Sequence, residues 1–126
     1  MNNETRLIHY MGSSKKDLQK LPADVKEIFA QGLHNASLGD TPVGSKILKG
    51  FGGGSVLEII EDYKSDTYRA VYTIKFKEAV YVLHVFKKKS TKGIKTPKKD
   101  QELIESRLKD AIAYNKQSSK KKEHKK

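Results

Sequence analysis

Four residues of this chain have side chains suited to chemistry on a phosphate group and its attached nucleoside: Arg69, His84, Phe86 and Lys88. A guanidinium and an amine bind phosphate, and an imidazole exchanges protons near neutral pH. An aromatic ring can stack on a nucleic-acid base. All four residues occur in or directly after two segments rich in β-branched and aromatic residues, Thr67–Phe76 and Ala79–Lys87, which predicts that two strands position them.

The two segments are expected to form an antiparallel hairpin, with Lys77 and Glu78 as a two-residue loop. In this register Arg69 lies opposite Phe86, and His84 and Lys88 lie on the diagonals. Alternation then places these four residues, with Val71, on an exposed face of the sheet, and a slip of one residue would reverse the assignment. The other face is apolar and is expected to pack on helices; it carries Tyr68, Ala70, Tyr72, Ile74, Phe76, Ala79, Tyr81, Leu83 and Val85.

The flanking segments predict helices and further strands around the hairpin. Apolar residues recur at helical spacing after Pro22, at Val25, Ile28, Phe29 and Leu33, and a shorter helix precedes them from Ser13 or Ser14. Strands are expected at Arg6–Met11 and Val56–Glu61. A last helix is expected to begin at Thr96-Pro97, with an apolar stripe at Leu103, Ile104, Leu108, Ala111 and Ile112.

The net charge of +11 is concentrated in two lysine-rich stretches. Residues 87–99 contain seven lysines and no acid, and residues 116–126 contain six lysines and one glutamate. This distribution favours a polyanionic partner, above all nucleic acid, although a lysine run also serves simply to keep a surface solvated. Because residues 116–126 contain nothing apolar to bury, we expect one domain over residues 1–115 and a disordered lysine-rich tail over 116–126.

Several classes of function lack the residues that they require. The chain has no cysteine, so it forms no disulfide, and it contains neither a signal peptide nor an apolar membrane span, which together favour the cytoplasm. The four histidines are scattered and none lies at ligand spacing from the acids of residues 58–66, so neither a metal nor another cofactor is expected. The glycine-rich segment Lys49–Ser55 leads into a strand rather than a helix, unlike a phosphate-binding loop.

Metal-free phosphodiester chemistry remains compatible with the residues that are present. In such a reaction the 2′-hydroxyl of RNA attacks phosphorus, and the protein supplies a base, an acid and cations. Arg69, His84 and the lysines of residues 87–89 can fill these roles. A histidine within an apolar strand is, however, more often a core residue than a catalyst.

Two runs of sequence resemble the HigB-type, phage-derived branch of the RelE/ParE toxin superfamily. They are LKGFGGGSVLEI, residues 48–59, and YRAVYTIKFKEAVYVLHVFKKKSTKGIKTPKKDQELIESRL, residues 68–108, and the likeness extends over about residues 5 to 114. It implies a small α+β fold, in which an N-terminal helical hairpin packs on a mainly antiparallel sheet of about four strands, followed by a C-terminal helix. It also implies the toxin of a type II toxin–antitoxin system, which cleaves messenger RNA on the ribosome.

The same resemblance suggests roles for individual residues. The phosphate-binding arginine of RelE-like toxins falls on Arg69, and the basic residue that ends the following strand falls at or beside Lys88. His84 is the candidate for proton transfer, with Lys49 as the alternative. We therefore expect Arg69, His84 and Lys88 to be catalytic. Binding of RNA and the ribosome is expected to involve Lys49, Phe86, Lys87, Lys89, Lys92, Lys95, Lys98 and Lys99.

The sequence departs from the pattern of the superfamily at two places. Many relatives have an arginine two residues after the glutamate of the second strand, where this chain has Ile60 after Glu58, and Gly93–Pro97 lacks the tyrosine of RelE.

The expected partners are a cognate antitoxin, a helix-turn-helix protein encoded nearby, and the ribosome with its messenger RNA. Two alternatives remain: a ParE-like inhibitor of DNA gyrase, and a non-catalytic nucleic-acid-binding protein that stacks bases on Phe86 and Phe51.

Overall fold

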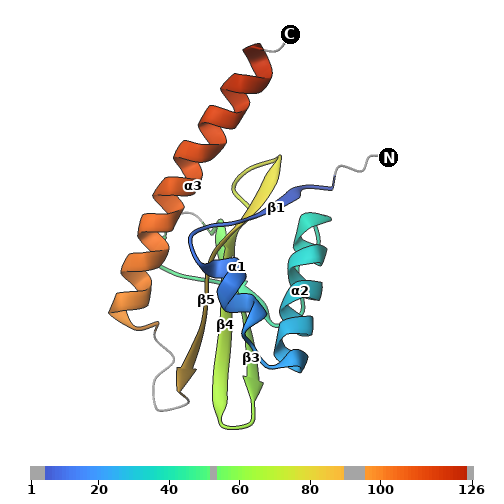
Figure 1. Ribbon diagram of the computed structural model, residues 1–126, viewed down its shortest axis with the longest axis vertical. Helices are drawn as coiled ribbons and strands as arrows, with labels where there is room; N and C mark the ends of the chain where they lie inside the picture. The colour runs from blue at the N-terminus through green and yellow to red at the C-terminus, as the bar shows by residue number, and fades with distance from the viewer. Residues whose placement is uncertain (1–4, 52–53, 90–95, 125–126) are drawn as a thin grey trace.

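The computed structural model describes residues 5–51, 54–89 and 96–124 (Figure 1). The described chain forms three helices and five strands. In chain order they are β1 (Leu7–Tyr10), α1 (Ser14–Gln19), α2 (Ala23–Ser37), β2 (Ser45–Ile47), β3 (Val56–Tyr63), β4 (Asp66–Thr73), β5 (Ala79–Lys89) and α3 (Lys98–His124).

The five strands form one sheet in the order β1-β5-β4-β3-β2. Only β1 is parallel to its neighbour, β5, and the other three pairings are antiparallel. The α+β class, the N-terminal helices, the mainly antiparallel sheet and the C-terminal helix are therefore confirmed. The sheet has five strands rather than about four, because the three-residue strand β2 follows Pro42 and Gly44 and is too short to show an alternating pattern.

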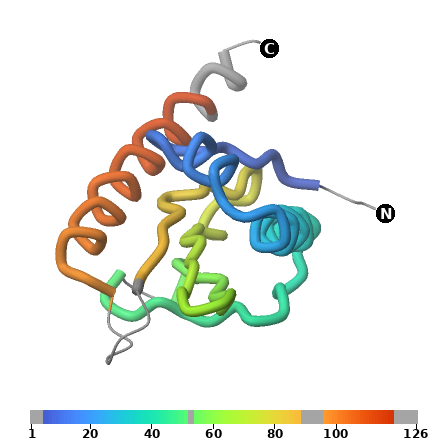
Figure 2. The backbone as a smooth tube through the Cα atoms, turned by 60° about the horizontal axis from the view of Figure 1, so that its bottom comes forward, coloured from blue at the N-terminus to red at the C-terminus, as the bar shows by residue number. Residues whose placement is uncertain are grey.

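Helices cover both faces of the sheet (Figures 1 and 2). On one face, α1 and α2 pack on the strands, with Val25, Phe29 and Leu33 of α2 fully buried as their spacing predicts. On the other face, α3 packs through Ile104 and Ala111. We expected this second face to be exposed, and that expectation is wrong because the apolar stripe of α3 requires a surface to cover.

The predicted register of the hairpin holds at one end and fails at the other. From Asp66 to Val71 each residue of β4 has the predicted partner on β5, including Arg69 opposite Phe86. Beyond Val71 the partners shift by one, so that Tyr72 lies opposite Val82 and Leu83 is the extra residue of a β-bulge.

The bulge changes which side chains face which helix. Tyr68, Ala70, Tyr72 and Val85 lie in the core beneath α1 and α2, as predicted, whereas Ala79, Tyr81 and Leu83 lie in the core beneath α3. The connection between the strands is also longer than the two residues predicted, because β4 ends at Thr73 and β5 begins at Ala79. The Thr73 hydroxyl accepts a hydrogen bond from the Lys75 amide at 3.2 Å, which ends the strand pairing locally.

The C-terminal helix α3 continues to His124 and projects beyond the sheet (Figure 1). Residues 116–124 are therefore helical rather than disordered as we predicted. Lysine, glutamine and glutamate are good helix formers, so a helix already docked by its first turns propagates without further apolar contacts. The division of the chain at residue 115 stays a prediction. None of the helices in the described part of the chain is long and apolar enough to cross a membrane.

Tyr72 tests this arrangement of the sheet. Its ring is 1% exposed, and its hydroxyl lies 2.7 Å from Ser45 Oγ. Tyr72→Ala should lower the free energy of unfolding by about 3–5 kcal/mol through lost burial. Tyr72→Phe keeps the ring and loses only the hydrogen bond, so it should cost about 0.5–1.5 kcal/mol. Urea denaturation of both variants measures the difference, and equal midpoints would contradict the burial of this ring.

Candidate functional site

A buried ion pair joins strands β3 and β4 beneath α3. Arg69 Nη1 lies 3.0 Å from Glu58 Oε1, and the two residues are 4% and 3% exposed. Glu58 is paired with Val71 and Arg69 with Ile60, so the two charges meet diagonally across one face of the sheet. Arg69 is therefore not an exposed phosphate ligand in this structure, because its side chain is buried and Glu58 compensates its charge.

Lys88 lies beside this ion pair and is half-buried. It is opposite Thr67 in the sheet, two residues from Phe86, the partner of Arg69. Desolvation and the nearby Arg69 guanidinium lower the pKa of the Lys88 amine, while Glu58 acts in the opposite direction. The structure thus brings Arg69 and Lys88 together, as their positions predict, and adds Glu58, which sequence reasoning did not assign to the site.

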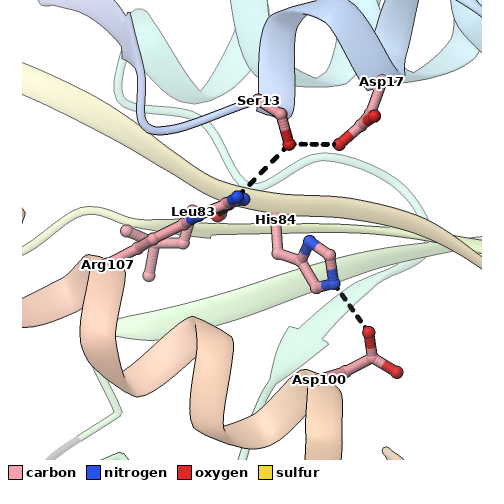
Figure 3. A network of polar contacts seen from close by, with 6 residues as sticks. All are labelled: Ser13, Asp17, Leu83, His84, Asp100 and Arg107. Carbon is pink, nitrogen blue, oxygen red and sulfur yellow. Dashed lines mark hydrogen bonds and ion pairs between the residues drawn. The ribbon is translucent and has the colours of Figure 1, made fainter.

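His84 forms a second polar pair beneath the first turn of α3 (Figure 3). Its Nε2 lies 2.8 Å from Asp100 Oδ1, and its ring stacks on Phe86 with a centroid distance of 4.5 Å. His84 Nδ1 is buried and has no hydrogen-bond partner among the described residues. When Nε2 carries the proton and donates it to Asp100, Nδ1 holds the lone pair, which is the arrangement of a base oriented by a carboxylate.

Arg107 of α3 forms a hydrogen bond to β5 at Leu83, the residue before His84 (Figure 3). Its Nη1 donates to the carbonyl of Leu83, the bulge residue, at 3.0 Å. Its Nη2 donates to Ser13 Oγ at 3.2 Å, and Ser13 in turn donates to Asp17 at 2.8 Å. Arg107 therefore links α3, β5 and the start of α1. Sequence reasoning missed it because the bulge carbonyl that it binds was not predicted.

The guanidinium of Arg107 leaves no space for a side chain at Gly12. This glycine has a φ of +56°, and a Cβ built on it would lie 2.5 Å from Arg107 Nε. Both the backbone conformation and the close approach require glycine at this position. The turn before α1 is therefore shaped to receive a side chain from the far end of the chain.

Exposed lysines surround the two buried pairs. Lys49 and Lys98 line a pocket of about 310 Å³ together with Phe51, Gln101, Glu102 and Glu105. Lys99 is exposed on the first turn of α3. Residues 49–51 and the start of α3, which are distant in sequence, thus meet at one surface.

The remaining predicted RNA-binding residues are placed differently. Lys87 is half-exposed and forms an ion pair with Asp66 at 3.6 Å, alternating with Phe86 and Lys88 along β5. Lys89 ends β5, and Lys92 and Lys95 lie outside the described residues. Among the residues described, no three His, Cys, Asp or Glu side chains form a group that could hold a metal ion.

The fold, a five-stranded sheet with N-terminal helices and a C-terminal helix, is consistent with a RelE-like protein. The chain matches the family model described as Phage derived protein Gp49-like (DUF891) over residues 16–109. The match covers most of the chain and contains both polar pairs, so the protein belongs to this phage-derived, RelE/toxin-like family. A search of curated proteins found no match.

The buried ion pair predicts a specific pattern of stabilities. Arg69→Ala leaves the Glu58 carboxylate buried and unpaired, which should lower the free energy of unfolding by about 3–5 kcal/mol. Replacing both partners, as in Glu58→Leu with Arg69→Met, removes both charges and should cost markedly less than either single change. Urea denaturation of the single and double variants completes the cycle. If the double variant loses as much free energy of unfolding as the two single variants lose together, the two charges are not coupled.

Proposed function

We propose that the protein is a HigB-like toxin of a type II toxin–antitoxin system and cleaves messenger RNA on the ribosome without a metal ion. The observation that carries this proposal is the convergence of the Arg69–Glu58 pair, Lys88 and the His84–Asp100 pair beneath the first turns of α3. The exposed Lys49 and Lys98, which line a pocket together with Glu102 and Glu105, can each contact an RNA phosphate. Membership of a RelE/toxin-like family supports the same function.

The chemistry requires one proton acceptor, one proton donor and positive charge near phosphorus. A base removes the proton of the 2′-hydroxyl, the 2′-oxygen forms a bond to phosphorus, and the bond from phosphorus to the 5′-oxygen breaks. The leaving 5′-oxygen takes up a proton, which gives a cyclic phosphate and a 5′-hydroxyl. Lys88, with its lowered pKa, is suited to proton donation and to stabilising the charge that builds on phosphorus.

His84 is the proposed base and Asp100 is the residue that positions it. Nδ1 is buried, so RNA can reach it only if side chains that cover the ring move while Asp100 stays bound to Nε2. Lys49 is the alternative base. It is exposed, so RNA can reach it without moving other side chains. Arg69 contributes indirectly, because its guanidinium lowers the pKa of Lys88 while Glu58 opposes this effect.

One observation favours a second candidate function. Both Arg69 and His84 are buried and are already engaged by carboxylates, whereas Lys49 and Lys98 are exposed. This favours a non-catalytic nucleic-acid-binding protein in which Lys49, Lys98 and Phe51 contact RNA. For either function we propose a cytoplasmic protein. For the toxin we further propose a helix-turn-helix antitoxin as its partner.

Sequencing of RNA 5′ ends after brief induction separates these functions. The toxin should produce cuts in phase with codons, and His84→Gln should reduce their frequency by about 10²–10⁴-fold, the range expected for loss of a general base. His34→Gln on the exposed side of α2 is the matched control and should cut normally. Absence of cuts by the folded wild-type protein would contradict cleavage, and accumulation of DNA breaks would instead support gyrase inhibition.

The two exposed lysines at this pocket, Lys49 and Lys98, give a separate prediction about affinity. Lys49→Gln with Lys98→Gln should weaken co-sedimentation with ribosomes and reduce the salt dependence of log K by about 0.7 for each phosphate that is no longer neutralised. Lys15→Gln with Lys20→Gln, which changes two exposed lysines at α1, removes the same charge elsewhere and should have a smaller effect. Equal binding and equal salt slopes for the two double variants would show that Lys49 and Lys98 do not contact RNA.

A further inference from the structure

A groove of about 700 Å³ lies on the opposite side of the sheet from the candidate site, between α2 and the edge formed by β3 and the segment before β2. Its apolar lining includes Ile28, which is 40% exposed, and Val43, which is 97% exposed. The helical spacing of α2 predicts Ile28 as a core residue, and that prediction is wrong. The chain that follows α2 curves around to the sheet edge and brings Val43 to the groove (Figure 2).

The floor of the groove exists because α2 carries a glycine there. Gly32 packs against β3 so closely that a Cβ built on it would lie 2.8 Å from Ile59 Cδ1. Tyr63 of β3 and Pro42 form further parts of the wall. The groove is therefore set by tight packing of α2 on β3, which makes it a preformed surface.

The charge of the groove is opposite to that of the protein as a whole. Asp24 and Glu27 of α2 and Glu61 of β3 line it, and no lysine or arginine of the described chain does. Within the described part of the chain, none of these three carboxylates takes part in an ion pair or hydrogen bond. Three unneutralised acids beside exposed apolar side chains stand out on a chain of net charge +11.

We infer that this groove binds a segment of a partner protein that presents apolar side chains flanked by lysine or arginine. The carboxylates repel a phosphate backbone, which argues against nucleic acid at this face. Two copies of this chain repel each other through their net charges, which argues against self-association. Charge complementarity thus favours a cationic, amphipathic segment of another protein. This inference goes beyond the proposed function and needs no RNA cleavage.

A displayed library of random 16-residue peptides tests the inference directly. Peptides are selected on the immobilised full chain and then depleted on the folded double variant Glu27→Lys with Glu61→Lys. The peptides that remain should carry net positive charge and apolar residues. Each should bind the double variant, and also Val43→Asp, at least tenfold more weakly than the wild-type protein. Asp110→Lys, a matched charge change on exposed α3, should leave their affinity unchanged.

Three outcomes would overturn the inference. The first is recovery of acidic peptides alone, which are expected to bind exposed lysines elsewhere on the protein instead. The second is recovery of cationic peptides that bind Val43→Asp as tightly as they bind the wild-type protein. The third is a wild-type dimer in light scattering that Val43→Asp dissociates, since the occupant would then be a second copy. Peptide binding is measured without RNA, so failure of the proposed cleavage activity leaves this test intact.

Discussion

Charges buried beneath α3 must be paired, and this constraint organises the candidate site. The helix covers the sheet face that carries Arg69 and His84, so water cannot solvate either side chain. Glu58 pairs with Arg69 from within the sheet, and Asp100 pairs with His84 from the helix itself. An unpaired charge at these positions would oppose docking of α3. The same pairs thus permit the fold and hold the groups on which the proposed chemistry depends.

The β-bulge at Leu83 connects the sheet to the site. Because one extra residue enters β5, both Leu83 and His84 belong to the side that α3 covers, and the Leu83 carbonyl accepts a hydrogen bond from Arg107. Arg107 and Asp100 lie on the same helix, so α3 contacts adjacent residues of β5 through two polar groups. The orientation of His84 is therefore determined by how α3 docks as much as by the strand that carries it.

Sequence reasoning was sufficient for the elements other than β2 and the end of α3, and for half of the hairpin register. Apolar periodicity placed α2 and α3, because this pattern repeats over several residues. The assumed loop at Lys77-Glu78 placed Arg69 opposite Phe86, and this pairing is correct because the longer connection and the bulge offset each other. The bulge was not predictable, since Ala79–Leu83 is apolar on both faces and a reversal of the faces leaves no mark in the sequence pattern. Glu58 and Asp100 were missed as partners because their contacts depend on how separate elements pack together. The apolar stripe of α3 did signal a buried surface, yet it did not indicate which face of the sheet would be covered.

The parallel pairing of β1 with β5 has a consequence for synthesis of the chain. The register joins Leu7 to Ala79, so the first strand has no partner until the last strand has been made. Contacts between such distant residues form late, and until then β5 lacks one of its neighbours. α3 comes later still, and it supplies Asp100 and Arg107. A nascent chain therefore acquires an intact site only after residues as far along the chain as Arg107 have left the ribosome.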